Sequence, residues 1–251
     1  MPDERGGHKY QLIAAELRAA IHRGQYAPGD RLPGENDLMR DYDVARMTAR
    51  QALAVLINEG VADPQKGRGV FVREFRPLIR QGVQRLSAAT WGTGRSVWTA
   101  DLDERDLRVD QVQIRRETPS DRICALLDLD GDDASVVVRS RRFVLDGKAV
   151  LLSTAYIPAV LAGGTQIEQA DTGPGGTYAR LAELGHAPAH FREDLRARMP
   201  DADEAEQLVM GPGVPVVDIT RTAFDAGGHP IEVNEMTADA GSYILRYDFD
   251  A

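Results

Sequence analysis

The fold of the first part of this chain is decided by residues 41–60, which read DYDVARMTARQALAVLINEG. From Met47 onward, apolar residues recur every three or four positions, the spacing that places one apolar stripe on an α-helix. These apolar positions are Ala49, Ala52, Leu53, Leu56 and Ile57. Gly60 follows them, where a helix commonly ends on a residue in the left-handed conformation. The stretch therefore predicts an amphipathic helix closed by Gly60.

Polar side chains gather at the start of this helix, mostly off the apolar stripe: Arg46, Thr48, Arg50 and Gln51. A helix whose first turns carry such groups can present them to an anionic partner, as the second helix of a helix-turn-helix does in the major groove of DNA. The alternative is an ordinary amphipathic helix with a solvated arginine face. The neighbouring segments favour the first interpretation.

Two predicted helices precede this one, and a predicted hairpin follows it. Residues 10–23 have one apolar face, formed by Leu12, Ile13, Leu17, Ala20 and Ile21. Residues 26–30 form a turn around Pro28 and Gly29, and residues 35–42 form the second helix. After Gly60, strands over 61–65 and 69–73 flank a tip that reads Lys66-Gly67-Arg68. Three helices and such a hairpin predict a winged helix-turn-helix over residues 1–75.

Composition and charge indicate a second domain with a different role. A chain of 251 residues is long enough for two modest domains, and the net charge of −9 is uneven. Residues 1–80 carry a net charge of +2, and the rest carry −11. DNA would repel the acidic part, so we expect a DNA-binding domain joined to a domain that does something else.

The remaining features of composition concern the compartment. No apolar run approaches the ~18 residues needed to cross a bilayer, and the polar N-terminus does not resemble a signal peptide. Cys124, the one cysteine, cannot form an internal disulfide and is expected to fill a core. We therefore expect a cytoplasmic protein with no membrane partner.

Residues 76–85 lack a clear period and are interpreted as a linker, followed by a second domain over residues 86–251. Strands are predicted over 109–116, 136–145, 149–157, 214–224, 231–236 and 243–249, the last ending the sheet. Helices are predicted over 120–129, 177–184 and 202–209. Strands that pair through hairpins, with helices between them, predict an α+β domain on an antiparallel sheet.

The first part resembles the DNA-binding domain of GntR-family transcriptional regulators over about 65 residues. The resemblance rests on Pro28-Gly-Asp-Arg-Leu-Pro33, on Val44-x-Arg46-x-Thr48-x-Arg50-Gln-Ala-Leu53 and on Gly67-x-Gly69-x-Phe71-Val72. It implies a set of DNA-facing residues: Glu35, Arg46, Thr48, Arg50, Gln51, Lys66, Gly67 and Arg68. Gly34 and Ala45 stand where the family usually has serine, which removes two hydroxyl groups from the expected interface.

The second part resembles the UTRA effector-binding domain of HutC-type GntR regulators, which has a chorismate-lyase-like fold. The resemblance rests on Arg139-x-Arg141-Arg-Phe143, Ser153-Thr-Ala-Tyr-Ile-Pro158, Gly175-Gly-Thr-Tyr178 and Gly228-x-Pro230-Ile-Glu232. It implies that a small anionic metabolite binds between the sheet and the loops. Gly176 stands where related regulators carry a serine two residues before the tyrosine, which weakens the inference to the sugar phosphates that some of them sense.

Arg139 and Arg141 share one face of a predicted strand, because side chains alternate along it. Two guanidinium groups at that spacing suit a phosphate or carboxylate; the alternative is that they pair with acids of their own domain. The glycines of residues 173–176 precede a predicted helix, whose free amides also suit an anion, although a plain turn explains them equally well. The candidate effector-binding residues are Arg139, Arg141, Ser153, Gly176, Thr177, Tyr178, Arg198, Glu232, Asn234 and Tyr243.

These observations predict a ligand-responsive transcriptional regulator, a homodimeric repressor released from a palindromic DNA operator by a small anionic effector. The alternatives are an enzyme that uses the lyase-like fold on such a metabolite, and an architectural DNA binder with no ligand. No nucleophile elbow or paired acid–base motif is present, and the chain has only three lysines. His186 and His190 have a metal-like spacing, but Pro188 interrupts the helix that would align them. We expect no metal and no cofactor, and we expect Trp91 and Trp98 to pack in a core.

Overall fold

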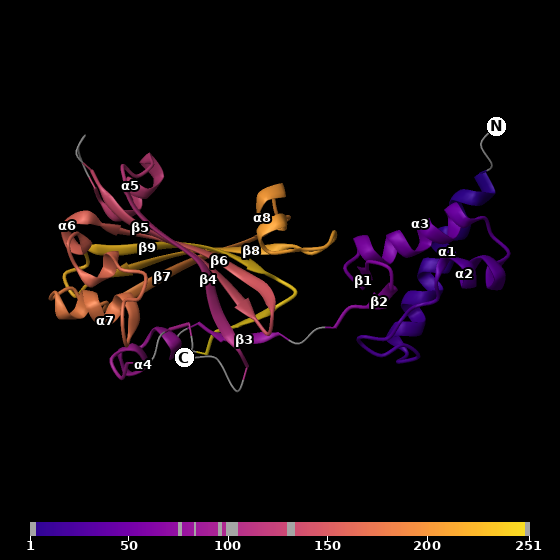
Figure 1. Cartoon of the computed structure of the whole chain (residues 1–251), viewed down its shortest axis with the longest axis horizontal. Coiled ribbons are helices and arrows are strands. Elements are labelled where there is room, and N and C mark those ends of the chain that lie inside the picture. Colours follow the sequence, from indigo (N-terminus) through magenta and orange to yellow (C-terminus); the bar gives the residue numbers. More distant parts are fainter. Residues whose placement is uncertain are drawn as a thin grey trace. The chain divides into compact units, whose positions relative to one another are not determined.

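A computed structural model describes residues 4–74, 77–82, 84–94, 97–98, 105–129 and 134–248. The chain divides into two compact units, residues 1–76 with 210–214 and residues 77–209 with 215–251 (Figure 1). None of the helices in the described ranges is both long and apolar enough to span a bilayer.

The first unit holds three helices and a two-stranded antiparallel sheet. The helices are α1 (Glu4–His22), α2 (Glu35–Tyr42) and α3 (Arg46–Asn58), and the strands are β1 (Ala62–Gln65) and β2 (Gly69–Val72). The apolar stripe of α3 packs inward, with Ala49, Ala52 and Leu56 fully buried. Gly60 has a φ of +72° just after the helix, as its closing role requires. The predicted winged helix-turn-helix is thus confirmed.

The first helix differs from its prediction at one core position. Ile13 and Leu17 are buried against the other helices, but Leu12 is 63% exposed. Leu12 belongs to the predicted apolar face, but its neighbour Ile13 is four residues before Leu17 and takes the buried position. Arg18, near the C-terminal end of α1, bonds to Glu59, the residue that follows α3. Its Nε and Nη2 both donate to the Glu59 carboxylate, with Nε 2.9 Å from Oε2.

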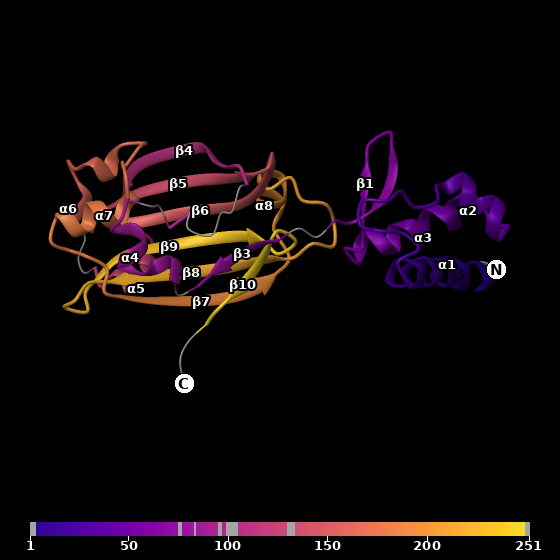
Figure 2. The ribbon, with the colours of Figure 1, turned by 90° about the horizontal axis from the view of Figure 1, so that it is seen from below.

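The second unit is built on a six-stranded antiparallel sheet, with strands in the order β4-β5-β6-β9-β8-β7 (Figure 2). The strands are β4 (Leu107–Glu117), β5 (Val136–Leu145), β6 (Lys148–Pro158), β7 (His190–Arg198), β8 (Val216–Phe224) and β9 (Pro230–Asp239). A separate parallel pair joins β3 (Leu78–Gln81) to β10 (Tyr243–Arg246). The antiparallel α+β architecture is confirmed.

Short helices cover both faces of the sheet. They are α4 (Ala88–Trp91), α5 (Asp121–Leu127), α6 (Ala159–Ala162), α7 (Gly176–Glu183) and α8 (Ala202–Gln207), with 3-10 turns at Gln84–Leu86 and Gln166–Glu168. Figure 1 shows α5 and α8 on one side of the sheet, and α4, α7 and β3 on the other.

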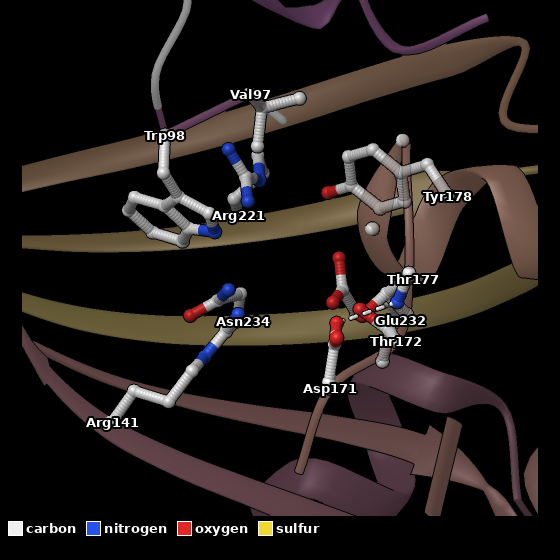
Figure 3. Close-up of a pocket in the computed structure, with 13 residues that line it drawn as sticks. Val97, Trp98, Arg141, Asp171, Thr172, Thr177, Tyr178, Arg221, Glu232 and Asn234 are labelled. Carbon is white, nitrogen blue, oxygen red and sulfur yellow. Dashed lines mark hydrogen bonds between the residues drawn. The ribbon is translucent and has the colours of Figure 1, made fainter. Parts of the chain in front are cut away.

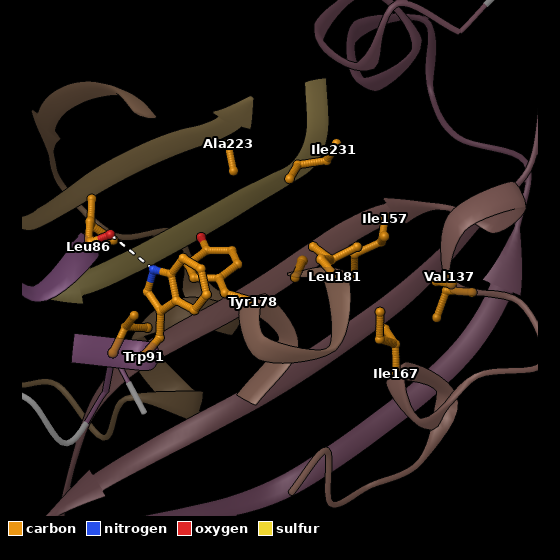
Figure 4. Packing of buried hydrophobic residues seen from close by; sticks show 12 residues of the cluster. Leu86, Trp91, Val137, Ile157, Ile167, Tyr178, Leu181, Ala223 and Ile231 are labelled. Carbon is orange, nitrogen blue, oxygen red and sulfur yellow. Dashed lines mark hydrogen bonds between the residues drawn. The ribbon is translucent and has the colours of Figure 1, made fainter. Parts of the chain in front are cut away.

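The core on the α7 side joins the helices to alternate residues of the strands (Figure 4). Tyr178 and Leu181 of α7 pack with Ile157 of β6 and Ile231 of β9. Trp91 packs edge-on against Tyr178, and its ring nitrogen donates to the Leu86 carbonyl at 3.2 Å. This core fixes α7 against the sheet.

Three parts of the second unit differ from the sequence interpretation. The expected linker over 76–85 contains β3, whose strand pairing with β10 is a long-range contact that local periodicity cannot show. For the same reason β10 does not end the main sheet, and the strand ends at Arg246, before the described residues Tyr247 and Asp248. β7 was not predicted, because six of its nine residues are exposed and its charged sequence hides the alternation. Residues 249–251 lie outside the described residues.

Candidate functional site

The first candidate site is the exposed start of α3. Arg46 and Arg50 project there with side chains 68% and 72% exposed. Gln51 is also exposed, and Thr48 is half-buried. The N-cap is Ala45, which offers no side-chain hydrogen bond, so the first amides of α3 are left for another partner. This end of the helix combines free donors, a positive dipole end and two arginines.

Glu35 lies between the two arginines. Its carboxylate is 3.8 Å from the Nε of Arg46 and 3.6 Å from the Nε of Arg50. Arg46 also donates to the side-chain oxygen of Asn36 at 3.2 Å. These contacts restrict the two long side chains before any partner arrives, so Glu35 orients the arginines.

The hairpin tip places the wing residues together on the surface. Lys66, Gly67 and Arg68 are all exposed, and a turn is closed by the amide of Arg68 donating to the Gln65 carbonyl at 2.9 Å. Gly67 has a φ of +73°, which favours glycine at the tip. The Arg68 guanidinium lies 5.4 Å from the centre of the Phe71 ring, which steadies it.

The second candidate site is a cavity of about 200 Å³ in the second unit, between the sheet and the start of α7 (Figure 3). Its lining residues are Val97, Trp98, Arg141, Asp171, Thr172, Gly173, Gly175, Gly176, Thr177, Tyr178, Arg221, Glu232 and Asn234. Six of the ten predicted effector-binding residues are among them: Arg141, Gly176, Thr177, Tyr178, Glu232 and Asn234.

One end of this cavity holds positive charge. Arg141 of β5 and Arg221 of β8 approach it from opposite sides, and Trp98 lies above them (Figure 3). The two guanidinium carbons lie 5.4 Å and 5.8 Å from the centre of the Trp98 ring. Burial, together with the nearby cations Arg139 and Arg221, lowers the pKa of Arg141 to about 10, so it stays protonated at neutral pH. An anion placed here would relieve both burial and repulsion.

Several buried donors at this end lack a partner among the described residues. They are Nε of Arg141, Nε and Nη1 of Arg221, and the side-chain nitrogen of Asn234. The Ser153 hydroxyl donates to the side-chain oxygen of Asn234 at 2.9 Å, which turns the amide nitrogen away from Ser153. Unsatisfied buried donors are costly, so their concentration here indicates a missing acceptor.

The other end of the cavity carries acceptors and the beginning of α7. Glu232, 2% exposed, and Asp171 lie near Thr177 and Tyr178 (Figure 3). Burial raises the pKa of Tyr178 well above its ordinary value, so its hydroxyl is neutral. Asp171 accepts from the amide of Gly173 at 2.8 Å, which shapes the loop before α7.

Gly175 makes this loop possible. It has a φ of +81°, and an added Cβ would lie 2.5 Å from the Cβ of Ala179 and 2.7 Å from the Trp91 carbonyl. A side chain at this position would therefore collide with α7 and with the end of α4, and the first amide of α7, that of Gly176, donates to the Gly173 carbonyl at 3.1 Å.

Four predicted effector-binding residues do not line the cavity. Arg139, 1% exposed, donates to the carbonyl oxygens of Ile167, Gln169 and Ala170, so it holds a loop. Among the described residues it forms no ion pair with an acid, so the alternative of pairing with acids of its own domain is not what the structure shows. Ser153 lies behind the lining residue Asn234, to which its hydroxyl donates. Arg198 is held by Glu204 and Asp218 at 2.5–2.8 Å, and Tyr243 lies on β10 away from the cavity lining.

Sequence reasoning missed several lining residues. Trp98 was expected only to pack; it does stack on Phe143 at 4.4 Å between ring centres, but it also covers the two arginines. Arg221 carried a signal, since it stands among apolar residues of a strand that alternates. Asp171 and Thr172 carried none beyond lying just before the glycine run.

The two spaced histidines are separated in the structure. The Nδ1 of His186 is 3.5 Å from Asp225, whereas the ring of His190 packs 5.6 Å from that of Phe224. No group of three or more His, Cys, Asp or Glu side chains within the described residues could hold a metal ion.

Comparison with known proteins agrees with this geometry. Residues 9–72 match the bacterial regulatory proteins of the gntR family, and residues 104–243 match the UTRA domain. The chain is 29% identical over 249 residues to the uncharacterized HTH-type transcriptional regulator SCO4628 of Streptomyces coelicolor, covering 96% of this chain and 92% of the relative. It is 26% identical over 228 residues to the HTH-type transcriptional repressor NagR of Bacillus subtilis, covering 89% and 87% respectively.

Solved structures contain the same domain folds. A crystal structure of a protein assigned to the GntR family of transcriptional regulators superposes with a TM-score of 0.65 at 27% identity, covering 97% of this chain and 98% of that one. PhnF of Mycobacterium smegmatis shares the fold, with a TM-score of 0.57 at 23% identity and coverage of 95% and 99%. The family and these named relatives are transcriptional regulators, which decides against the enzyme alternative. The chain therefore belongs to the GntR family of DNA-binding transcriptional regulators and carries a UTRA domain.

Proposed function

We propose that this protein is a homodimeric repressor that leaves a palindromic operator when a small anionic metabolite enters the cavity of its second unit. It acts in the cytoplasm, where its operator DNA lies. One relative carries the name of a repressor, which favours repression as the direction of control.

The proposed DNA interface consists of the exposed start of α3 and the wing tip. Arg46 and Arg50 supply the forked donors that pair best with guanine edges, and Glu35 orients them. Thr48, Gln51 and the amides at the start of α3 supply neutral donors. Lys66, Gly67 and Arg68 reach a neighbouring phosphate or groove from the wing.

The observation that carries the effector proposal is the set of buried, unpartnered donors on Arg141, Arg221 and Asn234. They converge on the positive end of the cavity, where a phosphate or carboxylate would satisfy them. Glu232 and Asp171 at the other end suit a hydroxyl or ammonium group of the same ligand. A volume of about 200 Å³ favours a compact metabolite.

The experiment that tests this proposal is a thermal-shift screen with sugar phosphates, phosphorylated hydroxy acids and small dicarboxylates. The same panel is then scored for release of an operator duplex selected from a random-sequence pool. We expect a member that both stabilises the protein and releases the duplex. If the active metabolite raises the unfolding temperature of wild type and of Arg141→Ala equally, the effector binds outside this cavity.

A further inference from the structure

Glu193 on β7 is a buried carboxylate that lies between two arginines. Its side chain is 7% exposed and forms an ion pair with Arg80 of β3, itself 4% exposed. The hydroxyl of Tyr247 donates to the same carboxylate at 3.0 Å. On the other side, Nη1 of Arg221 lies 4.0 Å from Oε1 of Glu193, which is too long for a hydrogen bond.

Arg221 belongs both to this cluster and to the effector cavity. It is 1% exposed, and its Nε and Nη1 find no hydrogen-bond partner among the described residues. Its charge is balanced by Glu193 at a distance and by the ring faces of Trp98 and Tyr178, 5.8 Å and 5.6 Å away. An anion in the cavity would therefore change which charge Arg221 faces.

Arg80 lies on the first strand of the second unit. That unit begins at residue 77, and β3 runs over Leu78–Gln81. The strand is attached through β10, where the amide of Leu78 donates to the Ser242 carbonyl at 2.8 Å and that of Gly82 to the Arg246 carbonyl at 2.7 Å. Among the described residues, the side-chain acid that pairs with Arg80 is Glu193. The Arg80–Glu193 pair thus fixes the strand that follows the DNA-binding unit along the chain.

We propose that Glu193 couples the effector cavity to β3: an anion bound to Arg221 neutralises the second cation beside Glu193 and strengthens the existing Arg80–Glu193 pair, which holds β3 and its partner β10 more firmly on β7. Without an anion, two buried cations compete for one carboxylate and repel each other. With an anion, Arg221 is neutralised within the cavity, and the anion repels Glu193 toward Arg80. Arg80 and Glu193 are positioning residues in this scheme, which rests on the proposed binding of an anion in the cavity.

The test uses the full-length protein and inorganic phosphate as the probe. Binding is measured by calorimetry, and backbone hydrogen exchange is measured over residues 77–82 and 243–248. In wild type, phosphate should slow exchange in both segments by about fivefold or more, the lower end of ordinary allosteric coupling. Glu193→Gln should still bind phosphate but show no such slowing. Glu117→Gln, which removes an exposed acid paired with Arg115 at 2.6 Å, is the matched control and should behave as wild type.

Phosphate that binds wild type without changing exchange over residues 77–82 would overturn the coupling while leaving the anion site intact. If phosphate does not bind wild type, the anion site is contradicted. The coupling is then tested separately by hydrogen exchange of a variant measured in the absence of phosphate. Arg221→Met removes the competing cation while keeping an apolar stem against Trp98 and Tyr178. In the absence of phosphate it should slow exchange over residues 77–82, and unchanged or faster exchange there contradicts the coupling.

Discussion

Arg139 and Arg141 differ by two positions on β5, and the structure gives them different surroundings. The two Nη atoms of Arg139 donate to three backbone carbonyls, whereas Arg141 lines the cavity. The Nε of each arginine is buried with no hydrogen-bond partner among the described residues. Strand alternation predicts that they share a face, and they do. It cannot predict that the loop at residues 167–170 folds over one of them and not the other.

This difference gives the first prediction. Arg139→Ala should lower the stability of the second unit by at least about 2 kcal/mol, because it leaves buried carbonyls without donors. Arg141→Ala should leave the unfolding temperature near that of wild type but weaken anion binding about tenfold or more, the value of a charge-assisted hydrogen bond. Thermal unfolding and calorimetry with the best-stabilising member of the metabolite panel measure the two effects. The reverse pattern would make Arg139 the effector ligand.

The second prediction concerns the arginines of α3. Arg46→Ala and Arg50→Ala should each weaken binding to the selected operator by about 1–3 kcal/mol and relax its sequence preference, because each removes a forked donor. Neither should change the thermal unfolding, since both side chains are largely exposed. Arg108→Ala, which removes an exposed arginine of the second unit, is the control. If both α3 variants bind the operator with wild-type affinity, this helix does not lie in the major groove of the DNA.

At the scale of elements, β3 and its partner carry the next prediction. Burial alone would raise the pKa of Glu193, but the hydrogen bond and charge of Arg80 outweigh it, so this pKa lies below its ordinary value of 4.5. A lowered folded-state pKa contributes stability that is present above the unfolded-state pKa and is lost as the pH falls through the folded one.

Wild type should therefore have a higher free energy of unfolding than Glu193→Gln. This difference should be largest at pH 6–7 and should shrink as the pH falls below about 4.5. Thermal unfolding measured from pH 7 to pH 3 tests this, with Glu117→Gln as the exposed control. A difference that grows on acidification would mean that Glu193 is protonated in the folded protein.

The predictable elements are those whose period is local. The limits of α2 and β5 match the sequence prediction residue for residue, because each carries a regular apolar pattern between clear turn residues. β3 and β7 escaped notice for a different reason. β3 is only four residues long and depends on a partner more than 160 residues away, and β7 is an edge strand whose exposed charges mask its period.

The residues of the candidate effector site also differ in whether a local sequence pattern predicts them. Arg141, Glu232 and Asn234 could be named from strand alternation and family resemblance, since each stands on the inner face of a regular strand. The ion pairs of Arg198 could not be predicted in the same way. It lies on a strand as well, but its partners Glu204 and Asp218 come from other elements, and only the folded structure brings them within 2.5–2.6 Å.

At the scale of the whole molecule, we expect a homodimer that places two winged domains on half-sites about one helical turn apart, roughly 34 Å. One winged domain of this size makes too few contacts for specific binding at physiological salt, and a second copy doubles them. Light scattering at micromolar concentration and the protein-to-duplex ratio at saturation measure this. A monomer that binds the operator one to one would contradict it.

The link between the cavity and the operator is the central feature of the proposed switch. Because coupling between two binding sites is reciprocal, an effector that weakens operator binding must itself bind less tightly to the operator complex, by the same factor. The measurement is a calorimetric titration of the best-stabilising panel member into free protein and into protein saturated with the selected operator. We expect affinities that differ by about 5–150-fold, matching the loss of operator affinity caused by that ligand. Equal affinities in the two titrations would show that the cavity does not control DNA binding.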